Sequence, residues 1–138
     1  VDTIYVSGTN CDVGSDTINS MLLKFVDEQE NAHFDHNLGY GGFVERLATM
    51  YAIVGNSSAG ISIDQSLKVG TITIGRRQEG RERATSVIDC VGSAQSIMVA
   101  FEIIDSPEFK EMIQNVYNPY YKGDDVAKTI VKTLLEKL

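Results

Sequence analysis

Short segments rich in β-branched residues alternate with segments of helical periodicity along almost the whole chain. Strands that alternate with helices in this way usually pair in parallel, with the helices covering the faces of the sheet. The sequence therefore predicts an α/β domain with a mostly parallel sheet. The segments expected to form strands are residues 2–8, 32–38, 51–56, 69–75 and 86–92.

The predicted helices follow from apolar residues spaced three and four positions apart. The apolar residues of the first two are Ile18, Met21, Leu22, Phe25 and Val26, and then Phe43, Val44, Leu47 and Met50. Further helices are expected over residues 58–68, 93–104 and 124–138. Ser106 and Pro107 are typical of the start of one more helix, and Asp124 or Asp125 is expected to cap the last one. The short strand 51–56 is expected to be buried on both faces.

Length and charge exclude several classes of protein. A chain of 138 residues corresponds to one domain, residues 1–138. The formal net charge of −7 disfavours a nucleic-acid-binding protein, which would usually be basic. No apolar run reaches the 18 residues that a membrane span needs, and the chain does not open with a signal peptide. We therefore expect a cytoplasmic protein that binds neither nucleic acid nor membrane.

The cysteines and histidines do not predict a metal site. Cys11 and Cys90 are far apart and form no CxxC pair, so reduced thiols are favoured, although the sequence leaves a disulfide open. His33 and His36 lie in a predicted strand and have no matching set of cysteines or carboxylates. We expect neither a metal nor a cofactor.

A small polar loop follows the predicted third strand, where residues 53–62 read IVGNSSAGIS. Ligands of parallel α/β sheets bind beyond the carboxyl ends of the strands. Glycine lets the backbone approach a ligand, and the free N–H groups of a helix start attract anions. The hydroxyl groups of Ser57 and Ser58 add donors. The loop therefore fits either a phosphate site or a plain turn with a serine cap.

Arginines gather after the next predicted strand, in the stretch GRRQEGRER. Such a cluster is often only a solvated surface, here with Glu79 and Glu82 interleaved. The planar guanidinium group also matches phosphate oxygens. Because successive loops of a parallel sheet emerge at the same edge, the serine and arginine loops are expected to face one cleft. A diphosphate is the simplest ligand for that pair.

The chain resembles the C-terminal domain of UDP-N-acetylglucosamine 2-epimerases in segments that run along its whole length. The segments are TNCDVGSDTINSML, LGYGGFVERL, GNSSAGIS, KVGTITIGRRQEGRERATSVIDC and NPYYKGDDVAKTI. The forms GNSS and RQxGR look closer to the hydrolysing branch of the sialic-acid pathway than to the non-hydrolysing branch.

This resemblance implies a Rossmann-like three-layer domain, the UDP-binding half of a glycosyltransferase-B architecture. Such enzymes eliminate UDP from UDP-N-acetylglucosamine to give 2-acetamidoglucal, and hydrolysing members add water to release N-acetylmannosamine. Their products serve sialic-acid or cell-surface polysaccharide biosynthesis. The catalytic groups belong to a missing N-terminal domain and to a histidine before the matched region, so this chain alone is expected to be inactive, with no catalytic residue of its own.

The resemblance also implies a set of ligand contacts. Ser57 and Ser58 would donate to the diphosphate of UDP or UDP-N-acetylglucosamine, and Arg77 would contact its phosphates. Gly60 would permit close approach of the backbone, and Arg81 is a weaker match. Arg76 and Arg83 have no clear role in the family and are expected to be solvated surface. The expected UDP-binding residues are Gly55, Asn56, Ser57, Ser58, Gly60, Arg77 and Arg81.

Two positions depart from the family pattern. Ile63 stands where the family has a glutamate that binds the ribose, and the neighbouring Asp64 would point elsewhere on a helix. Tyr121 replaces a usual glycine. A degenerate, non-catalytic binding or interaction module and part of a UDP-dependent glycosyltransferase therefore stay as alternatives. Because the family's domain begins with a further strand and helix, we expect an uncovered sheet edge and possible homodimerisation.

Overall fold

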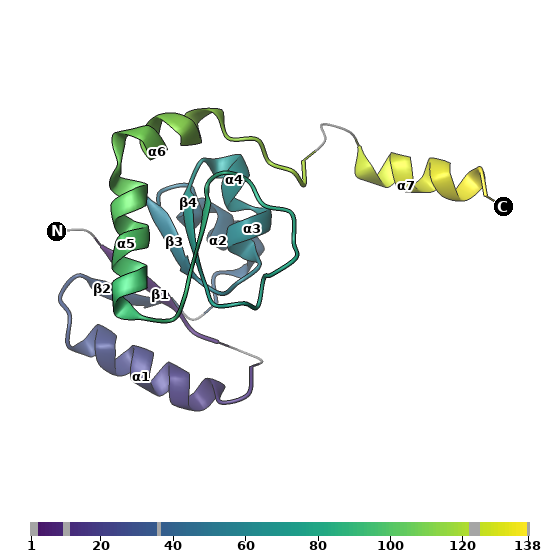
Figure 1. Cartoon of the computed structure of the whole chain (residues 1–138). Helices are drawn as coiled ribbons and strands as arrows, with labels where there is room; N and C mark the ends of the chain where they lie inside the picture. The colour runs from purple at the N-terminus through teal and green to yellow at the C-terminus, as the bar shows by residue number, and fades with distance from the viewer. Residues whose placement is uncertain (1–2, 10–11, 36, 122–124, 138) are drawn as a thin grey trace. The chain divides into compact units, whose positions relative to one another are not determined.

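The computed structural model describes residues 3–9, 12–35, 37–121 and 125–137 and shows an α/β arrangement (Figure 1). All strand pairs of the described residues are parallel, which confirms the fold class predicted from the alternation. The elements are β1 (Ile4–Ser7), α1 (Ser15–Asp27), β2 (Ala32–Asp35), α2 (Gly39–Leu47), β3 (Ala52–Gly55), α3 (Ala59–Ser62), α4 (Asp64–Leu67), β4 (Gly70–Ile74), β5 (Val87–Cys90), α5 (Ala94–Asp105), α6 (Pro107–Met112), the 3-10 turn η1 (Ile113–Asn115) and α7 (Val126–Leu135).

The chain forms two compact units, the first of which is Val1–Phe43. Here β1 and β2 pair from Ile4 opposite Ala32 to Ser7 opposite Asp35. The side chain of Asn19 on α1 holds the end of β1, because it accepts from the Thr9 N–H and donates to the Thr9 carbonyl, both at 2.8 Å. Helix α1 forms where its periodicity predicts it, but none of its described residues is buried.

The second unit, Val44–Leu138, contains a three-stranded sheet in the order β3-β4-β5. The central strand β4 is buried along Gly70–Thr73, as a strand with a neighbour on each side should be. The expectation that residues 51–56 are buried on both faces is wrong. In the described residues β3 is an edge strand of this sheet, and Val54 is 41% exposed.

Adjacent residues of β4 show how the layers of this unit are built, since successive side chains of a strand point to opposite faces. Ile72 packs in a buried apolar cluster with Ala100, Ile104, Phe109 and Ile113 from α5, α6 and η1. On the opposite face, the Thr71 hydroxyl donates to the carbonyl of Gly60 in α3 at 2.7 Å. The sheet therefore lies between α5 with α6 on one side and α3 on the other (Figure 1).

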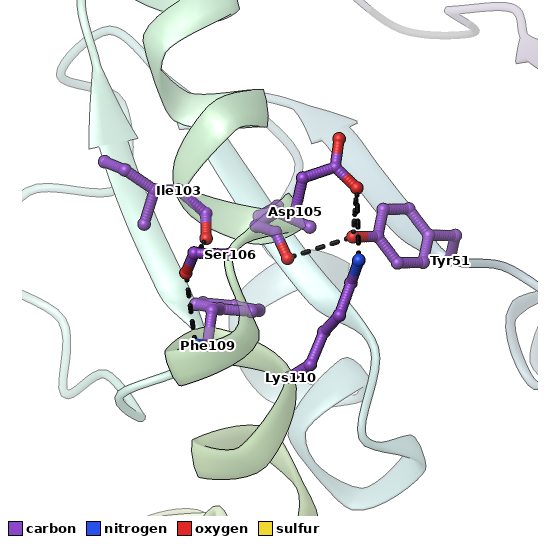
Figure 2. Close-up of polar contacts among 7 residues, drawn as sticks. Tyr51, Ile103, Asp105, Ser106, Phe109 and Lys110 are labelled. Carbon is purple, nitrogen blue, oxygen red and sulfur yellow. Dashed lines mark hydrogen bonds and ion pairs between the residues drawn. The ribbon is translucent and has the colours of Figure 1, made fainter.

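The break between α5 and α6 is held by polar contacts around Ser106 (Figure 2). The Ser106 hydroxyl donates to the Ile103 carbonyl at 2.7 Å and accepts from the Phe109 N–H at 3.2 Å, so one side chain ends α5 and caps α6. Pro107 occupies the first turn of α6, as predicted.

Tyr51, just before β3, ties the same break to the sheet (Figure 2). Its hydroxyl oxygen lies 2.9 Å from the Ile104 carbonyl oxygen and 2.9 Å from Asp105 Oδ1. Lys110 Nζ lies 3.4 Å from the same carboxylate and 5.8 Å from the centre of the Tyr51 ring. These contacts fix the direction in which α6 leaves α5, and so place Phe109 over β4.

The segment 58–68, predicted as one helix, forms the two single turns α3 and α4, which meet at Ile63. The last predicted helix forms α7, and Asp125 caps it by accepting from the Lys128 N–H at 3.2 Å. This backbone bond, together with the Lys128 ammonium, lowers the pKa of the Asp125 carboxyl. Asp124 lies outside the described residues. The described part of the chain contains no helix long and apolar enough to cross a membrane.

Cys90 is a free, half-buried thiol on β5. Cys11 lies outside the described residues, so its predicted state stays a prediction. The same holds for His36, whereas His33 on β2 stacks against Tyr5 with ring centres 5.4 Å apart.

Two neighbouring isoleucines of α5 provide a matched test of the core. Ile104 is 1% exposed and Ile103 is 45% exposed. Truncation of a buried isoleucine removes apolar burial and leaves a cavity, so Ile104→Ala should lower the free energy of unfolding by about 2–5 kcal/mol. The control Ile103→Ala should cost less than about 1 kcal/mol. Equal losses in urea denaturation of the two variants would contradict this packing.

Candidate functional site

The carboxyl ends of β3, β4 and β5 lie along one edge of the sheet, because all three strands run in the same direction. Gly55 at the end of β3 is opposite Thr73, and Ile74 at the end of β4 is opposite Cys90. The Gly75 N–H donates to the Cys90 carbonyl at 2.9 Å. The serine loop and the arginine loop therefore leave the sheet at the same edge, as the sequence predicts.

Glycine is needed where each of the two loops begins. Gly55 has φ 155° and Gly75 has φ 78°, values that residues with a Cβ atom rarely adopt. A Cβ added at either position would meet nothing within 4 Å, so the backbone angle explains the glycine rather than a close neighbour. The two turns direct both loops away from their strands.

The serine loop presents its polar groups at the surface. Asn56, Ser57 and Ser58 are all exposed. The Ser57 hydroxyl accepts from the Ala59 N–H at 3.3 Å, which leaves its own hydrogen available to another acceptor. Ser58 occupies the N-cap position of α3, but its side chain makes no capping bond. The serine-capped turn that the sequence allows is thus made by Ser57 rather than by Ser58.

Gly60 has a different place from the three residues before it. It is buried, and its carbonyl accepts the hydrogen bond from Thr71 on the neighbouring strand. Its position against β4 serves the packing of α3 on the sheet. Ile63 follows as the half-buried C-cap of α3.

The arginines of the loop after β4 divide into three kinds. Arg76 is solvated as predicted: its side chain is 88% exposed and its Nε lies 2.8 Å from Glu79 Oε2. Arg77 and Arg81, the two expected ligand residues, are exposed on the same loop. The expectation that Arg83 is solvated surface is wrong.

Arg83 is a structural residue of this loop. Its side chain is only 22% exposed and forms an ion pair with Asp89 of β5. Its Nη2 also donates to the Gln78 carbonyl at 2.6 Å. Charge patterning could not identify this role, because the partner Asp89 belongs to the next strand.

Gln78 is a site residue that the sequence reasoning missed. Its side chain is buried, at 3% exposure, and its Nε2 donates to the Asn56 carbonyl at 2.8 Å. This bond joins the arginine loop directly to the serine loop. Gln78 is part of the RQxGR form quoted above, but a lone glutamine between charged residues carries no periodic signal, and its contact with the serine loop is visible only in the fold.

The NPYY sequence, residues 118–121, contacts both the arginine loop and helix α4. The Tyr120 hydroxyl donates to the Glu82 carbonyl at 2.9 Å, and Asn118 Nδ2 donates to the Ser66 hydroxyl at 2.7 Å. Tyr121, the departure from the family pattern, is 67% exposed. It borders an open hollow of about 450 Å³ together with Ser66, Lys68, Val116, Tyr117 and Asn118.

The described residues contain no group of three or more histidines, cysteines or carboxylates that could hold a metal ion. At this edge the loops after β3 and β4 carry the hydroxyls of the exposed Ser57 and Ser58 and the guanidinium groups of the exposed Arg77 and Arg81. Together these groups suit an anionic ligand with several oxygen atoms, such as a phosphate ester.

Known proteins are similar to this chain over 73–94% of its length. Residues 3–135 match the family model described as UDP-N-acetylglucosamine 2-epimerase. The polysialic acid biosynthesis protein P7 of Escherichia coli is 34% identical over 129 residues, which cover 94% of this chain and 32% of that protein.

Two further relatives carry epimerase names. The GDP/UDP-N,N'-diacetylbacillosamine 2-epimerase (hydrolyzing) of Campylobacter jejuni is 37% identical over 106 residues, or 74% of this chain and 26% of the relative. The UDP-N,N'-diacetylbacillosamine 2-epimerase (hydrolyzing) of Legionella pneumophila is 29% identical over 102 residues, or 73% of this chain and 27% of the relative. The chain thus spans about a third or less of these relatives. Since the family model covers 133 consecutive positions, residues 3–135, the chain belongs to the UDP-N-acetylglucosamine 2-epimerase family.

Proposed function

We propose that this chain binds the UDP part of a UDP-2-acetamido sugar, in the first place UDP-N-acetylglucosamine, as the nucleotide-binding half of a 2-epimerase. The observation that supports the proposal most is the 2.8 Å bond from Gln78 to Asn56, which brings the serine and arginine loops together at the ligand-binding edge of the sheet. Membership of the epimerase family supports UDP as the anion that we propose there.

Each loop would contribute a different interaction. The hydroxyl groups of Ser57 and Ser58 would donate to the diphosphate oxygens, with the backbone at Gly55 and Asn56 turned toward the same place. Arg77 would neutralise phosphate charge through its planar guanidinium group, and Arg81 is a second, weaker candidate. Gly60 would keep α3 close to β4 beneath the loop.

These contacts suit the first step of the reaction that we propose for the 2-epimerase of which this chain would be the nucleotide-binding half. Loss of the proton at C2 and cleavage of the bond from C1 to the phosphate oxygen give 2-acetamidoglucal and UDP. Negative charge collects on the β-phosphate as that bond breaks. Donors fixed in advance at this position lower the barrier, because they stabilise charge that is greatest in the transition state.

We propose that residues outside this chain carry out the second step and the proton transfers. In the hydrolysing reaction, water adds to the glucal and N-acetylmannosamine is released. The acid and base groups would come from an N-terminal domain, so we propose that the chain alone binds UDP without turning over substrate. We further propose that the protein is cytoplasmic, where UDP-sugars are made and used. We also propose that it forms a homodimer.

A degenerate binding module is the alternative that a particular residue favours. Ile63 replaces the glutamate that the family uses on the ribose, and an isoleucine side chain cannot form a hydrogen bond. The glycosyltransferase alternative has weaker support, because the matched family and two of the three relatives carry the epimerase description.

The first test is calorimetric titration with UDP of the full-length polypeptide that carries this chain. Arg77→Ala should weaken UDP binding about 10- to 150-fold, as expected for the loss of a hydrogen bond between charged groups. Arg76→Ala is the matched control, since Arg76 lies in the same loop, is 88% exposed and pairs locally with Glu79. Equal affinities of the wild type and both variants, or no binding of UDP at millimolar concentration, would overturn the proposed site.

Mutation of Ile63 can restore the glutamate that the family has at this position. If the family's carboxylate binds the ribose hydroxyls from this position, Ile63→Glu should raise the affinity for UDP about tenfold or more. Ile63→Gln, of nearly the same size but without the charge, should gain less. If neither variant binds more tightly than the wild type, position 63 does not face the ribose in this protein.

Product analysis separates the enzyme classes. The full-length polypeptide, incubated with UDP-N-acetylglucosamine and no acceptor sugar, should release UDP and a 2-epimerised sugar, detectable by NMR. A glycosyltransferase would form a glycoside only when an acceptor is added. Turnover that needs an acceptor would therefore contradict the epimerase proposal.

A further inference from the structure

Gln78 is buried in a loop whose neighbouring residues are exposed. Its side chain is 3% exposed, whereas Arg77 and Glu79 on either side lie at the surface. Gln78 Nε2 donates to the Asn56 carbonyl, 2.8 Å away and 22 residues earlier in the chain. Each end of this hydrogen bond is one residue from a proposed ligand contact, since Asn56 precedes Ser57 and Gln78 follows Arg77.

The backbone of Gln78 is also held in place by a hydrogen bond. Its carbonyl accepts from Arg83 Nη2 at 2.6 Å, and Arg83 is in turn paired with Asp89 on β5. A continuous series of polar contacts thus runs from β5 through Arg83 and Gln78 to the loop after β3. It connects the loop after β3, the loop after β4 and strand β5.

Stability alone gives little reason for an amide at this position. The Gln78 Oε1 atom is buried and has no hydrogen-bond partner among the described residues. A buried acceptor without a partner is destabilising, and an apolar side chain of the same length would avoid that cost. Asn56 is an exposed residue, so its carbonyl could bond to water instead. What only the amide supplies is a fixed link between the two loops.

We propose that Gln78 is a positioning residue that sets the spacing between the Ser57–Ser58 loop and Arg77, so that both reach the two phosphates of one diphosphate. This inference rests on the proposed function. Donors that are held in place before binding lose less freedom when the ligand arrives, so the link contributes to affinity without touching the ligand. A ligand with one phosphate needs only one of the loops and should gain little from it.

The test compares two nucleotides on the Gln78→Met variant of the full-length polypeptide. Methionine keeps the length and apolar body of the side chain but cannot donate to Asn56. We expect UDP to bind at least about tenfold more weakly than to the wild type, and UMP less than about threefold more weakly. Arg76→Met, in the same loop, should change neither value. Equal losses for UDP and UMP, or no loss for either, would overturn the inference.

Amide hydrogen exchange of the ligand-free protein provides an independent measurement. The N–H groups of Ala59, Ile61 and Ser62 are hydrogen-bonded within the serine loop and α3, and should exchange faster in Gln78→Met. Amides of the core strand β4 should not change. Unchanged exchange at the loop, or faster exchange throughout the sheet, would contradict a local link.

The two measurements also distinguish failure of this inference from failure of the proposed function. If the wild type binds no UDP, the proposed function is wrong and the diphosphate role of Gln78 falls with it. Faster loop exchange in the variant would then still support the link between the loops. If the wild type binds UDP and Gln78→Met changes neither affinity nor exchange, the inference alone is wrong.

Discussion

The burial of β4 between two parallel neighbours is the constraint on which the second unit depends. The strand pairs with β3 on one side and β5 on the other, and its residues Gly70–Thr73 are buried. Ile72 anchors the apolar layer of α5 and α6, while Thr71 anchors α3 on the opposite face. Because β3 and β5 both run parallel to β4, the loops that follow the three strands all leave the sheet at one edge. The same packing that stabilises the unit therefore also assembles the candidate site.

Sequence patterns predicted the parts of this structure that depend on local periodicity. The parallel α/β class, the cap at Ser106, a cap at Asp124 or Asp125, and the exit of two polar loops at one edge all follow from spacing and residue type. The order of the strands in the sheet does not follow from local periodicity. The exposed position of Val54 on an edge strand depends on which strands pair, and that is decided by contacts between distant segments.

The roles of Arg83 and Gln78 could not be predicted for a related reason. Both lie in a loop where charged and polar residues follow one another, and such a stretch is usually solvated. Their partners, Asp89 and Asn56, lie six residues later and 22 residues earlier. Only the parallel pairing of β4 with both neighbours brings these partners within hydrogen-bonding distance. The sequence therefore identified the loop as a candidate site but not the residues that shape it.

The shortness of α3 changes how an anion would be held at this edge. The sequence predicted a helix over residues 58–68, with a dipole that would add to the attraction of its N–H groups. The structure has a single turn, Ala59–Ser62, which ends at Ile63. A macrodipole grows from many aligned peptide units, so one turn supplies little of it. Positive charge must then come from side chains, and the protein as a whole is acidic, with 19 Asp and Glu against 12 Lys and Arg. Arg77 and Arg81, the residues of the loop after β4 that match the family's ligand contacts, would supply that charge at the proposed diphosphate site. A fixed distance from this loop to the serine hydroxyls then matters more here than it would beside a long helix.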